Sequence, residues 1–183
     1  MEKITLNGKE IIIRKLAVKD LKIAQKHLDF YNSLLDESLY ITSFKKLSLK
    51  QEKEYLKGKL KKQKQGKCIY LVSECDGEFA SHVEVHLMEG KQDHIGILGF
   101  AHREGFRGIG LGSVLGRIMT EMVLSAAKEL SPKPRIIQAG IYAENKASLG
   151  LAEKFGFKEV AIIPKQFQYD GKLMDEIIVQ LYL

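Results

Sequence analysis

The densest group of residues that could do chemistry is the glycine-rich run Gly105-Phe-Arg-Gly-Ile-Gly-Leu-Gly-Ser113, between a predicted strand and a predicted helix. Glycines let a backbone approach a ligand closely, and the unpaired N–H groups at a helix N-terminus bind anions. The run therefore predicts a pyrophosphate site, with a tight strand-to-helix turn as the alternative. Its spacing excludes a P-loop, because no Lys follows Gly110 or Gly112, and a GxGxxG dinucleotide motif, because Ser113 or Leu115 stands in the last position.

A strand before this run and a helix after it have to position it, and the surrounding sequence predicts both. Alternating or β-branched apolar residues indicate strands, and apolar residues three and four apart indicate helices. The predicted strands cover residues 10–14, 68–74, 79–88, 94–102, 135–143, 159–163 and 176–182. The predicted helices cover residues 18–35, the segment 45–67, about five turns from residue 112, and the residues between Asn145 and Gly156. Asp76-Gly77 indicates a hairpin, so three consecutive antiparallel strands are expected before the glycine-rich run.

The composition fits one globular domain over residues 1–183. That length is short for two full-sized domains, and 45% hydrophobic with 28% charged residues excludes a disordered or collagen-like chain. No apolar run approaches the roughly 20 residues of a membrane helix, and the N-terminus lacks the features of a signal peptide. We therefore expect a cytoplasmic protein with no membrane partner.

The net charge of +6 is concentrated in the Lys-rich segment 45–67, which holds ten Lys and two acids. Leu49, Leu56 and Leu60 follow helical spacing there, so a surface helix with a solvated Lys face is expected, and a docking surface for an acidic partner is the alternative. The segment lacks the Arg residues and interleaved aromatic residues typical of nucleic-acid binding. We expect no nucleic-acid partner.

Two motif blocks together resemble one enzyme family. Arg107-x-x-Gly110-x-Gly112 resembles the [Gln/Arg]-x-x-Gly-x-[Gly/Ala] signature of the GNAT superfamily of acetyl-CoA-dependent N-acetyltransferases. Asn145-Lys-Ala-Ser148, followed by Lys154-Phe-Gly-Phe157, is similar to the family's second block in the form found in ribosomal-protein N-terminal acetyltransferases. The order of predicted elements is also similar to the family fold from end to end.

The resemblance implies an α/β (α+β) fold with a mixed, mostly antiparallel sheet of about seven strands, flanked by four helices and splayed into a V-shaped cleft for acetyl-CoA. It implies that the pantetheine arm lies along Phe100, Ala101 and His102. The residues that match the loop around the pyrophosphate are Arg107, Gly108, Ile109, Gly110, Leu111, Gly112 and Ser113. Asn145 matches a CoA-contacting position, and Lys154 lies where a cation could meet the nucleotide. For Arg107, a solvated surface charge is the alternative.

Acetyl transfer needs a neutral amine, a polarised thioester carbonyl and a proton for the leaving thiolate. Three positions that often supply catalytic side chains in the family have no acidic or basic group here. Ala152 stands where relatives carry a Tyr as general acid, Gly96 where they carry Glu or His, and Gly140 where others carry Glu. An α-amine, with a pKa of roughly 7.7–8.0, needs less help from a base than a lysine-like amine at roughly 10.4. The lack of catalytic side chains at these three positions therefore favours a peptide or protein N-terminus as acceptor.

A substitute base is suggested by His82-x-Glu84-x-His86, whose side chains alternate and so share one face of a strand. Pairing through the turn at residues 90–93 would set Glu84 or His86 opposite Gly96, where a missing side chain leaves room. We hypothesise that Glu84 or His86 acts as the base, directly or through water. A polar row without catalytic function is the alternative, and we predict no metal, because spacing fixes no fourth ligand.

Ser148 is the candidate proton donor to the thiolate, because it matches the Asn-x-x-Ser position of the ribosomal-protein enzymes. A serine in the first turn of a helix, without a catalytic role, is the alternative. Tyr142 and Tyr169 are further candidate donors without a positional match.

We therefore expect an acetyl-CoA-dependent N-acetyltransferase that acts by direct attack in a ternary complex. Its partners would be acetyl-CoA and a protein N-terminus or an amine-bearing small molecule, and a homodimer is left open. Polyamines are disfavoured, because the chain has no acid-rich run. The alternative function is a non-catalytic acyl-CoA-binding module with the same fold.

Overall fold

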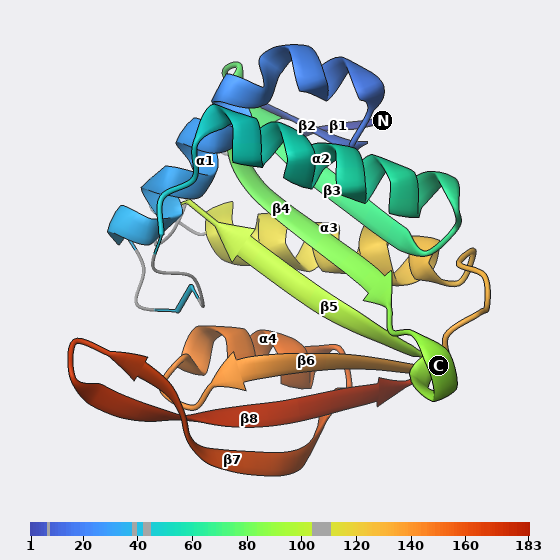
Figure 1. Cartoon of the computed structure of the whole chain (residues 1–183), viewed down its shortest axis with the longest axis vertical. Coiled ribbons are helices and arrows are strands. Elements are labelled where there is room, and N and C mark those ends of the chain that lie inside the picture. The colour runs from blue at the N-terminus through green and yellow to red at the C-terminus, as the bar shows by residue number, and fades with distance from the viewer. Residues whose placement is uncertain (7, 38–39, 42–44, 104–110) are drawn as a thin grey trace.

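The computed structural model describes residues 1–6, 8–37, 40–41, 45–103 and 111–183. Within these residues eight strands form one sheet in the order β1-β2-β3-β4-β5-β6-β8-β7 (Figure 1). Neighbouring strands are antiparallel except for β5 and β6, which are parallel. The expected mixed, mostly antiparallel sheet with four helices is confirmed, with one strand more than expected.

The strands are β1 (Glu2–Leu6), β2 (Lys9–Lys15), β3 (Cys68–Cys75), β4 (Glu78–Leu87), β5 (Ile95–His102), β6 (Ile136–Tyr142), β7 (Lys158–Tyr169) and β8 (Lys172–Tyr182). The helices are α1 (Ala24–Glu37), α2 (Leu49–Lys64), α3 (Leu111–Ala127) and α4 (Lys146–Lys154), with short 3-10 helices η1 (Val18–Ile23) and η2 (Gly90–Gln92). The strand that was not expected is β1, whose alternating Ile4 and Leu6 pack on the core. None of the helices in the described part of the chain has the length and apolarity that a membrane crossing requires.

Local sequence signals account for the hairpins and for two of the helix ends. Asp76-Gly77 and Asp170-Gly171 have positive φ at both residues, as a type I′ hairpin turn requires. The Ser48 hydroxyl accepts the Gln51 N–H, so a capping box begins α2. Gly156, with φ of 83°, follows the last turn of α4 as a C-terminal glycine.

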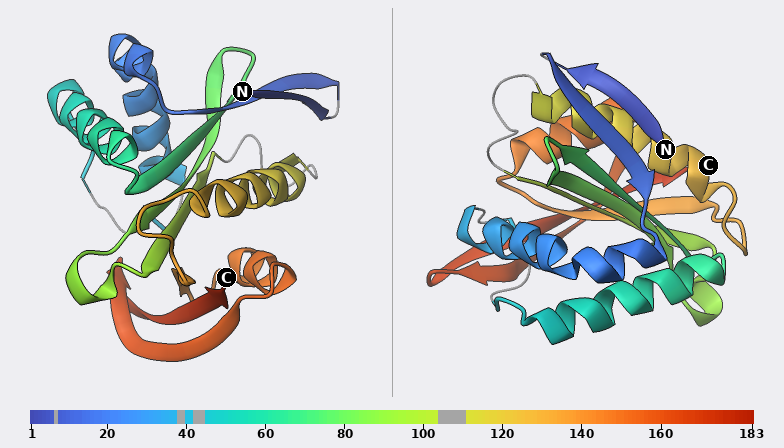
Figure 2. Two further views of the ribbon diagram at one scale, coloured as in Figure 1. Left: turned by 90° about the vertical axis from the view of Figure 1, so that its right-hand side faces the viewer. Right: turned by 90° about the horizontal axis from the view of Figure 1, so that it is seen from above.

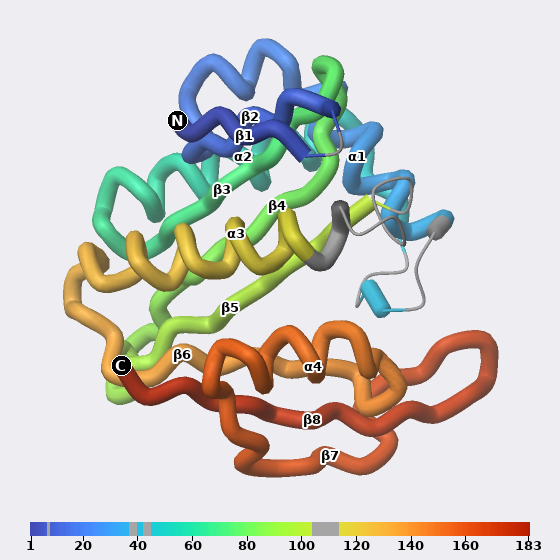
Figure 3. Tube along the Cα trace, turned by 180° about the vertical axis from the view of Figure 1, so that it is seen from behind, coloured from blue at the N-terminus to red at the C-terminus, as the bar shows by residue number. Residues whose placement is uncertain are grey.

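Helices cover both faces of the sheet (Figures 2 and 3). On one face, α3 buries Leu115, Met119 and Val123 against Val83 and Val85 of β4, and α4 packs beside it. On the other face, α1 and α2 pack against β3 and β4. The two faces of β4 therefore differ, because its valines face α3 while His82 and Glu84 face α1 and α2.

β5 and β6 pair over only three residues each, 95–97 with 136–138. β5 continues to His102 beside β4, and β6 continues to Tyr142 beside β8. The two strands therefore diverge from a closed end, as Figure 1 shows. At that end a Cβ on Gly96 would lie 2.8 Å from Val85 Cγ1 and 2.9 Å from Ile137 Cδ1, so a glycine lets β4, β5 and β6 approach one another.

A buried ionic cluster joins β2, β3, η1 and α1. The Arg14 guanidinium donates two hydrogen bonds to the Asp20 carboxylate, at 2.7 and 2.8 Å, and its Nε donates to Glu74 at 2.7 Å. Asp20 also accepts the Ala17 N–H at 2.7 Å and faces His27 Nε2 at 3.2 Å. Burial alone would raise the pKa of Asp20, but the hydrogen bonds from His27, Arg14 and Ala17 lower it below its usual range.

Replacing Asp20 should therefore destabilise the fold strongly. We expect Asp20→Ala to lower the free energy of unfolding by about 3–5 kcal/mol, because it leaves the buried guanidinium without its principal partner. Glu10→Ala, which breaks the exposed Lys3–Glu10 pair, should cost less than about 1 kcal/mol. Urea unfolding of both variants checks this, and equal costs would refute the role given to the cluster.

Candidate functional site

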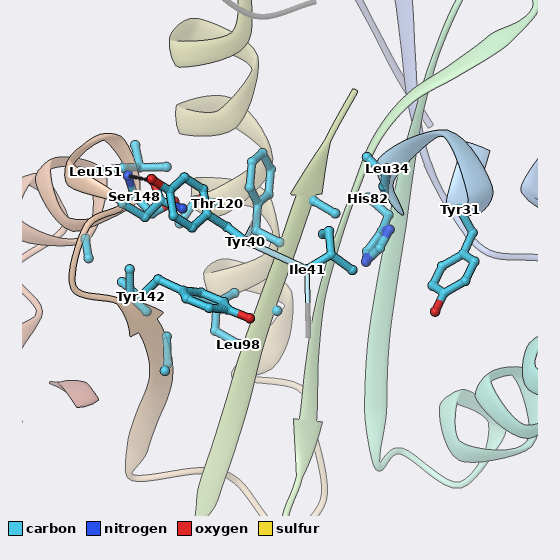
Figure 4. A pocket seen from close by; sticks show the side chains of 18 of the residues that line it. Tyr31, Leu34, Tyr40, Ile41, His82, Leu98, Thr120, Tyr142, Ser148 and Leu151 are labelled. Atoms are coloured by element: carbon cyan, nitrogen blue, oxygen red, sulfur yellow. Dashed lines mark hydrogen bonds between the residues drawn. The ribbon is translucent and has the colours of Figure 1, made fainter. Parts of the chain in front are cut away.

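The splay between β5 and β6 opens into a cavity of about 580 Å³. Residues 98–101 of β5 and 139–142 of β6 line it on the two diverging strands. Figure 4 shows Ser148 and Leu151 of α4 to one side of β5, and His82 and Tyr31 to the other. Since residues 98–102 of β5 have no strand partner on their β6 side in the described chain, their peptide groups on that side can hydrogen-bond a bound molecule.

Of the expected cofactor residues on β5 and at α4, Phe100, Ala101 and Asn145 line the cavity, whereas His102 and Lys154 are absent from its described lining. His102 is buried behind Phe100 with the two rings stacked at 6.1 Å. Asn145 lines the cavity and also caps α4, because its side-chain oxygen accepts the Ser148 N–H at 3.1 Å. Ser148 lines the cavity as well, while Lys154 is exposed in the last turn of α4.

The expected pyrophosphate loop is described only at its end. Arg107, Gly108, Ile109 and Gly110 lie outside the described residues. Leu111, Gly112 and Ser113 form the first residues of α3, as the predicted loop-to-helix junction requires.

The expectation that Glu84 or His86 faces an open space at Gly96 is wrong. Leu87 pairs with Gly96, so that Glu84 lies opposite Gly99 and His86 opposite Ile97. The position is also full, because the side chains of Val85 and Ile137 occupy the place where a Cβ on Gly96 would lie. The turn between β4 and β5 contains η2, and its residues alone did not fix the register.

Glu84 and His86 are absent from the described lining of the cavity. Glu84 makes a short ion pair with Lys59 of α2, and His86 Nδ1 lies 3.6 Å from its other oxygen. Burial would raise the pKa of Glu84, but His86 and Lys59 together lower it to about 2. A carboxylate held so firmly as an anion is a weak base, and its evident role is to hold α2 on the sheet. The described part of the chain contains no cluster of three or more His, Cys, Asp or Glu suited to a metal ion.

His82, the first residue of the same row, does line the cavity. Its ring stacks on Tyr70 at 5.2 Å and meets Phe30 edge-on at 5.8 Å. Burial lowers the pKa of His82 to about 4, so its imidazole is neutral at physiological pH. Of this row, His82 alone therefore contributes to the described wall of the cavity, as a neutral imidazole.

Glu176 of β8 occupies the space left at Gly140, which sequence reasoning missed. It pairs with Tyr142 and so lies diagonal to Gly140 on the same face of the sheet. A Cβ on Gly140 would overlap the Glu176 carboxylate, and both residues line the cavity. Burial raises the pKa of Glu176. The sequence gives no local signal for this arrangement, because it depends on the register between β6 and β8.

Hydroxyl groups lie near this carboxylate. Tyr142 lines the cavity, and its ring stacks on Phe167 at 4.0 Å. Burial, and then the charge of Glu176, raise the pKa of Tyr142, so the phenol stays protonated. Ala152, where relatives carry a Tyr, also lines the cavity, whereas Tyr169 is exposed beside the β7–β8 turn.

The α1 and α2 side of the cavity is lined mainly by aromatic and apolar residues, with one acid among them. The acid is Glu52 of α2, which is 3% exposed. The sequence did contain an indication that this acid is buried. Glu52 lies three residues after Leu49 and four before Leu56, which places it on the apolar face of a Lys-rich helix. The aromatic residues on this side are Phe30, Tyr31, Tyr55 and Tyr70, whereas the Tyr40 ring lies 5.5 Å from that of Tyr142 on β6.

Solved structures with the same fold include three bacterial proteins. An acetyltransferase of the GNAT family from Streptococcus pneumoniae has a TM-score of 0.76 at 21% identity, covering 94% of this chain and 99% of that chain. The ribosomal-protein-alanine N-acetyltransferase from Brucella melitensis has a TM-score of 0.75 at 23% identity, with coverage of 94% and 99%. The protein yncA from Salmonella typhimurium, solved with its cofactor acetyl-CoA, has a TM-score of 0.74 at 19% identity, with coverage of 94% and 94%.

No curated protein sequence matches the chain. A family model does: the one described as "Acetyltransferase (GNAT) family" matches residues 29–157, which is more than half of the sequence. The match spans α1 to α4 and includes both motif blocks. The chain therefore belongs to the GNAT family of acetyltransferases.

Proposed function

We propose that this chain transfers an acetyl group from acetyl-CoA to a primary amine in a ternary complex, without a covalent enzyme intermediate. The cavity at the β5–β6 splay carries the proposal. It joins an unpaired strand edge and the N-terminal turn of α4 to an aromatic pocket on the other side of β5, so two substrates can meet there. Family membership supports acetyl transfer, and yncA gives an acetyl-CoA-bound example of the fold.

For acetyl-CoA, we assign the thioester arm to the free edge of β5 at Phe100 and Ala101. Peptide N–H groups there would polarise the thioester carbonyl, as backbone donors do in other acyl-transfer sites. Asn145 and the α4 N-terminus adjoin the same stretch of cavity. The pyrophosphate is assigned to residues 107–113, of which 111–113 begin α3.

We assign Glu176 as the general base. Its carboxylate takes one proton from the acceptor ammonium, and the free amine attacks the carbonyl carbon of the thioester. A C–N bond forms and the C–S bond breaks, with the electron pair leaving on sulfur. Tyr142 or Ser148 protonates the thiolate and regains a proton from the attacking nitrogen, which carries one proton more than the amide product. The amide and CoA are released, and Glu176 returns its proton to water.

The acceptor argument changes once Glu176 is in place. The preference for a peptide or protein N-terminus rested on the lack of a base, and a carboxylate in the cavity allows a more basic amine as well. The rival function, a non-catalytic acyl-CoA-binding module, is supported by Gly96 and Ala152 but not by the carboxylate over Gly140.

Acetyl-CoA should stabilise the protein. At about 100 times its dissociation constant it should add roughly 2.7 kcal/mol, and each kcal/mol should raise Tm by about 2–4 °C for a domain of this size. Thermal unfolding with and without acetyl-CoA measures this, followed by release of free CoA thiol in the presence of amines and peptides. No shift would contradict the cofactor assignment, and a shift without thiol release for any acceptor would favour the rival function.

Glu176→Gln should lower kcat by about 100-fold or more, the usual contribution of a general base. The acetyl-CoA-induced Tm shift should remain, because the variant keeps the side chain's shape. Since the base acts deprotonated, wild-type kcat/KM should rise with pH through the raised pKa of Glu176, and the variant should lose this acidic limb. Glu159→Gln, on an exposed site of β7, is the matched control, and an unchanged pH profile for Glu176→Gln would discard the assignment.

Gly140→Ala tests the same carboxylate without altering it. The added methyl group would displace the Glu176 side chain, so we expect a loss of kcat with acetyl-CoA binding retained. The control is Gly58→Ala on the exposed face of α2, where a Cβ meets no atom within 4 Å and helix stability should rise by roughly 0.5–1 kcal/mol. Normal turnover in Gly140→Ala would show that the position of Glu176 is unimportant.

A further inference from the structure

Glu52 is a buried carboxylate that lines the cavity and has no partner among the described residues. Its side chain receives no hydrogen bond and no ion pair from the described residues, although the residue is 3% exposed. Unpaired buried carboxylates are costly to a fold and are rare outside sites that use them. Burial raises the pKa of Glu52 to about 7, so near neutral pH it readily becomes an anion when a cation arrives.

Among the described residues, no cation pairs with Glu52. Lys59, about two turns further along α2, is engaged by Glu84, and His82 is neutral. The rings of Tyr55 and Tyr70 meet edge to face, with centroids 6.5 Å apart. In the described chain, the titratable groups that line this side of the cavity are Tyr55 on α2, His27 and Tyr31 on α1, Tyr70 on β3 and His82 on β4. The Lys59–Glu84 pair is absent from that described lining, and Lys59 lies against the rings of Tyr55 and Tyr70.

Glu52 lies away from the place of acetyl transfer. Its charge acts on Tyr70 of β3, and β4 separates β3 from β5. In the sheet order, β4, β5 and β6 lie between β3, on which α2 packs, and β8, which carries Glu176. Glu52 and Glu176 therefore come from elements on opposite sides of the β5–β6 splay, and both line the cavity.

We propose that Glu52 binds a second positive charge of the acceptor, so that the acceptor is an extended diamine-type cation whose other, reacting amine lies at Glu176. This inference rests on the proposed acetyl transfer. Between the two acids the cavity is lined by aromatic and apolar side chains, which suit an alkyl chain and favour cations over their ring faces. The sequence argument against polyamines required an acid-rich run, whereas the fold brings together two isolated acids from α2 and β8.

A matched pair of probes tests the second charge. Hexamethylenediamine and hexylamine have the same carbon chain and differ in the second amine. The wild type should acetylate the diamine with a kcat/KM at least about tenfold higher, and Glu52→Gln should bring the two within about threefold by raising KM for the diamine. The preference should grow from about pH 6 to about pH 8, because Glu52 attracts a cation only when deprotonated, and the variant should lack this dependence.

The control is Glu54→Gln, which removes an acid from the exposed face of the same helix, where Glu54 pairs with Lys57. It should keep the full diamine preference. Equal use of the two amines by the wild type would overturn the inference while leaving acetyl transfer intact. Preference for an alanine-initiated peptide, unchanged in Glu52→Gln, would overturn it in favour of a protein acceptor. If the proposed acetyl transfer itself is wrong, no acceptor will release CoA from acetyl-CoA. That result differs from the two outcomes above, in which CoA is still released.

A stability measurement tests the buried, unpaired state of Glu52 without any substrate. The pKa of this acid is raised on folding, so the wild type should lose stability as pH rises from about 5 to about 7, while the unfolded chain is already ionised. Glu52→Gln removes that loss, so its Tm should exceed the wild-type Tm by several degrees at pH 8 and by little at pH 5. Hexamethylenediamine added to the CoA complex should raise the wild-type Tm more than that of the variant. A Glu52→Gln variant that is less stable at pH 8 would refute an unpaired acid.

Discussion

The three-residue pairing of β5 with β6 is the constraint on which the rest of the molecule depends. A sheet interior leaves no peptide group unpaired, so a splay in its middle exposes polar backbone that a ligand has to satisfy. The closed end is held by the approach of β4, β5 and β6 at Gly96, and α3 fills the face behind it. Beyond that point each strand keeps its other neighbour, β4 for β5 and β8 for β6, so both sides of the opening remain hydrogen-bonded within the sheet.

Four of the buried or half-buried acids in the described chain show how the fold treats charge. Asp20 and Glu84 are fully engaged, the first by Arg14 and the second by Lys59, and both tie a helical segment to the sheet. Glu52 and Glu176 have raised pKa values and line the cavity instead. The first two acids stabilise the walls, and the other two are left available inside them, which is the usual division between scaffold and site.

Much of this could be predicted from sequence. The two Asp-Gly turns, the capped α2, the long α3 and the motif blocks at residues 107–112 and 145–157 are local signals, and they predicted the family and the order of the elements correctly. The register between β4 and β5 could not be predicted, because η2 lies in their connection and the pattern of apolar residues allowed more than one pairing. The position of Glu176 in the cavity could not be predicted for the same reason, since only the pairing of β6 with β8 brings it over Gly140. Glu52 had a visible signal, its place on the apolar face of α2, which the surrounding lysines obscured.

The β7–β8 hairpin has a consequence for how this site could diversify. One continuous segment, residues 158–182, forms the edge of the sheet and carries both Glu176 and Phe167, the ring that supports Tyr142. In the proposed mechanism, the general base and one wall of the acceptor pocket are thus encoded together, apart from the cofactor motifs. A graft of this hairpin between relatives would exchange the base and part of the selectivity in a single event, provided that position 140 remains a glycine.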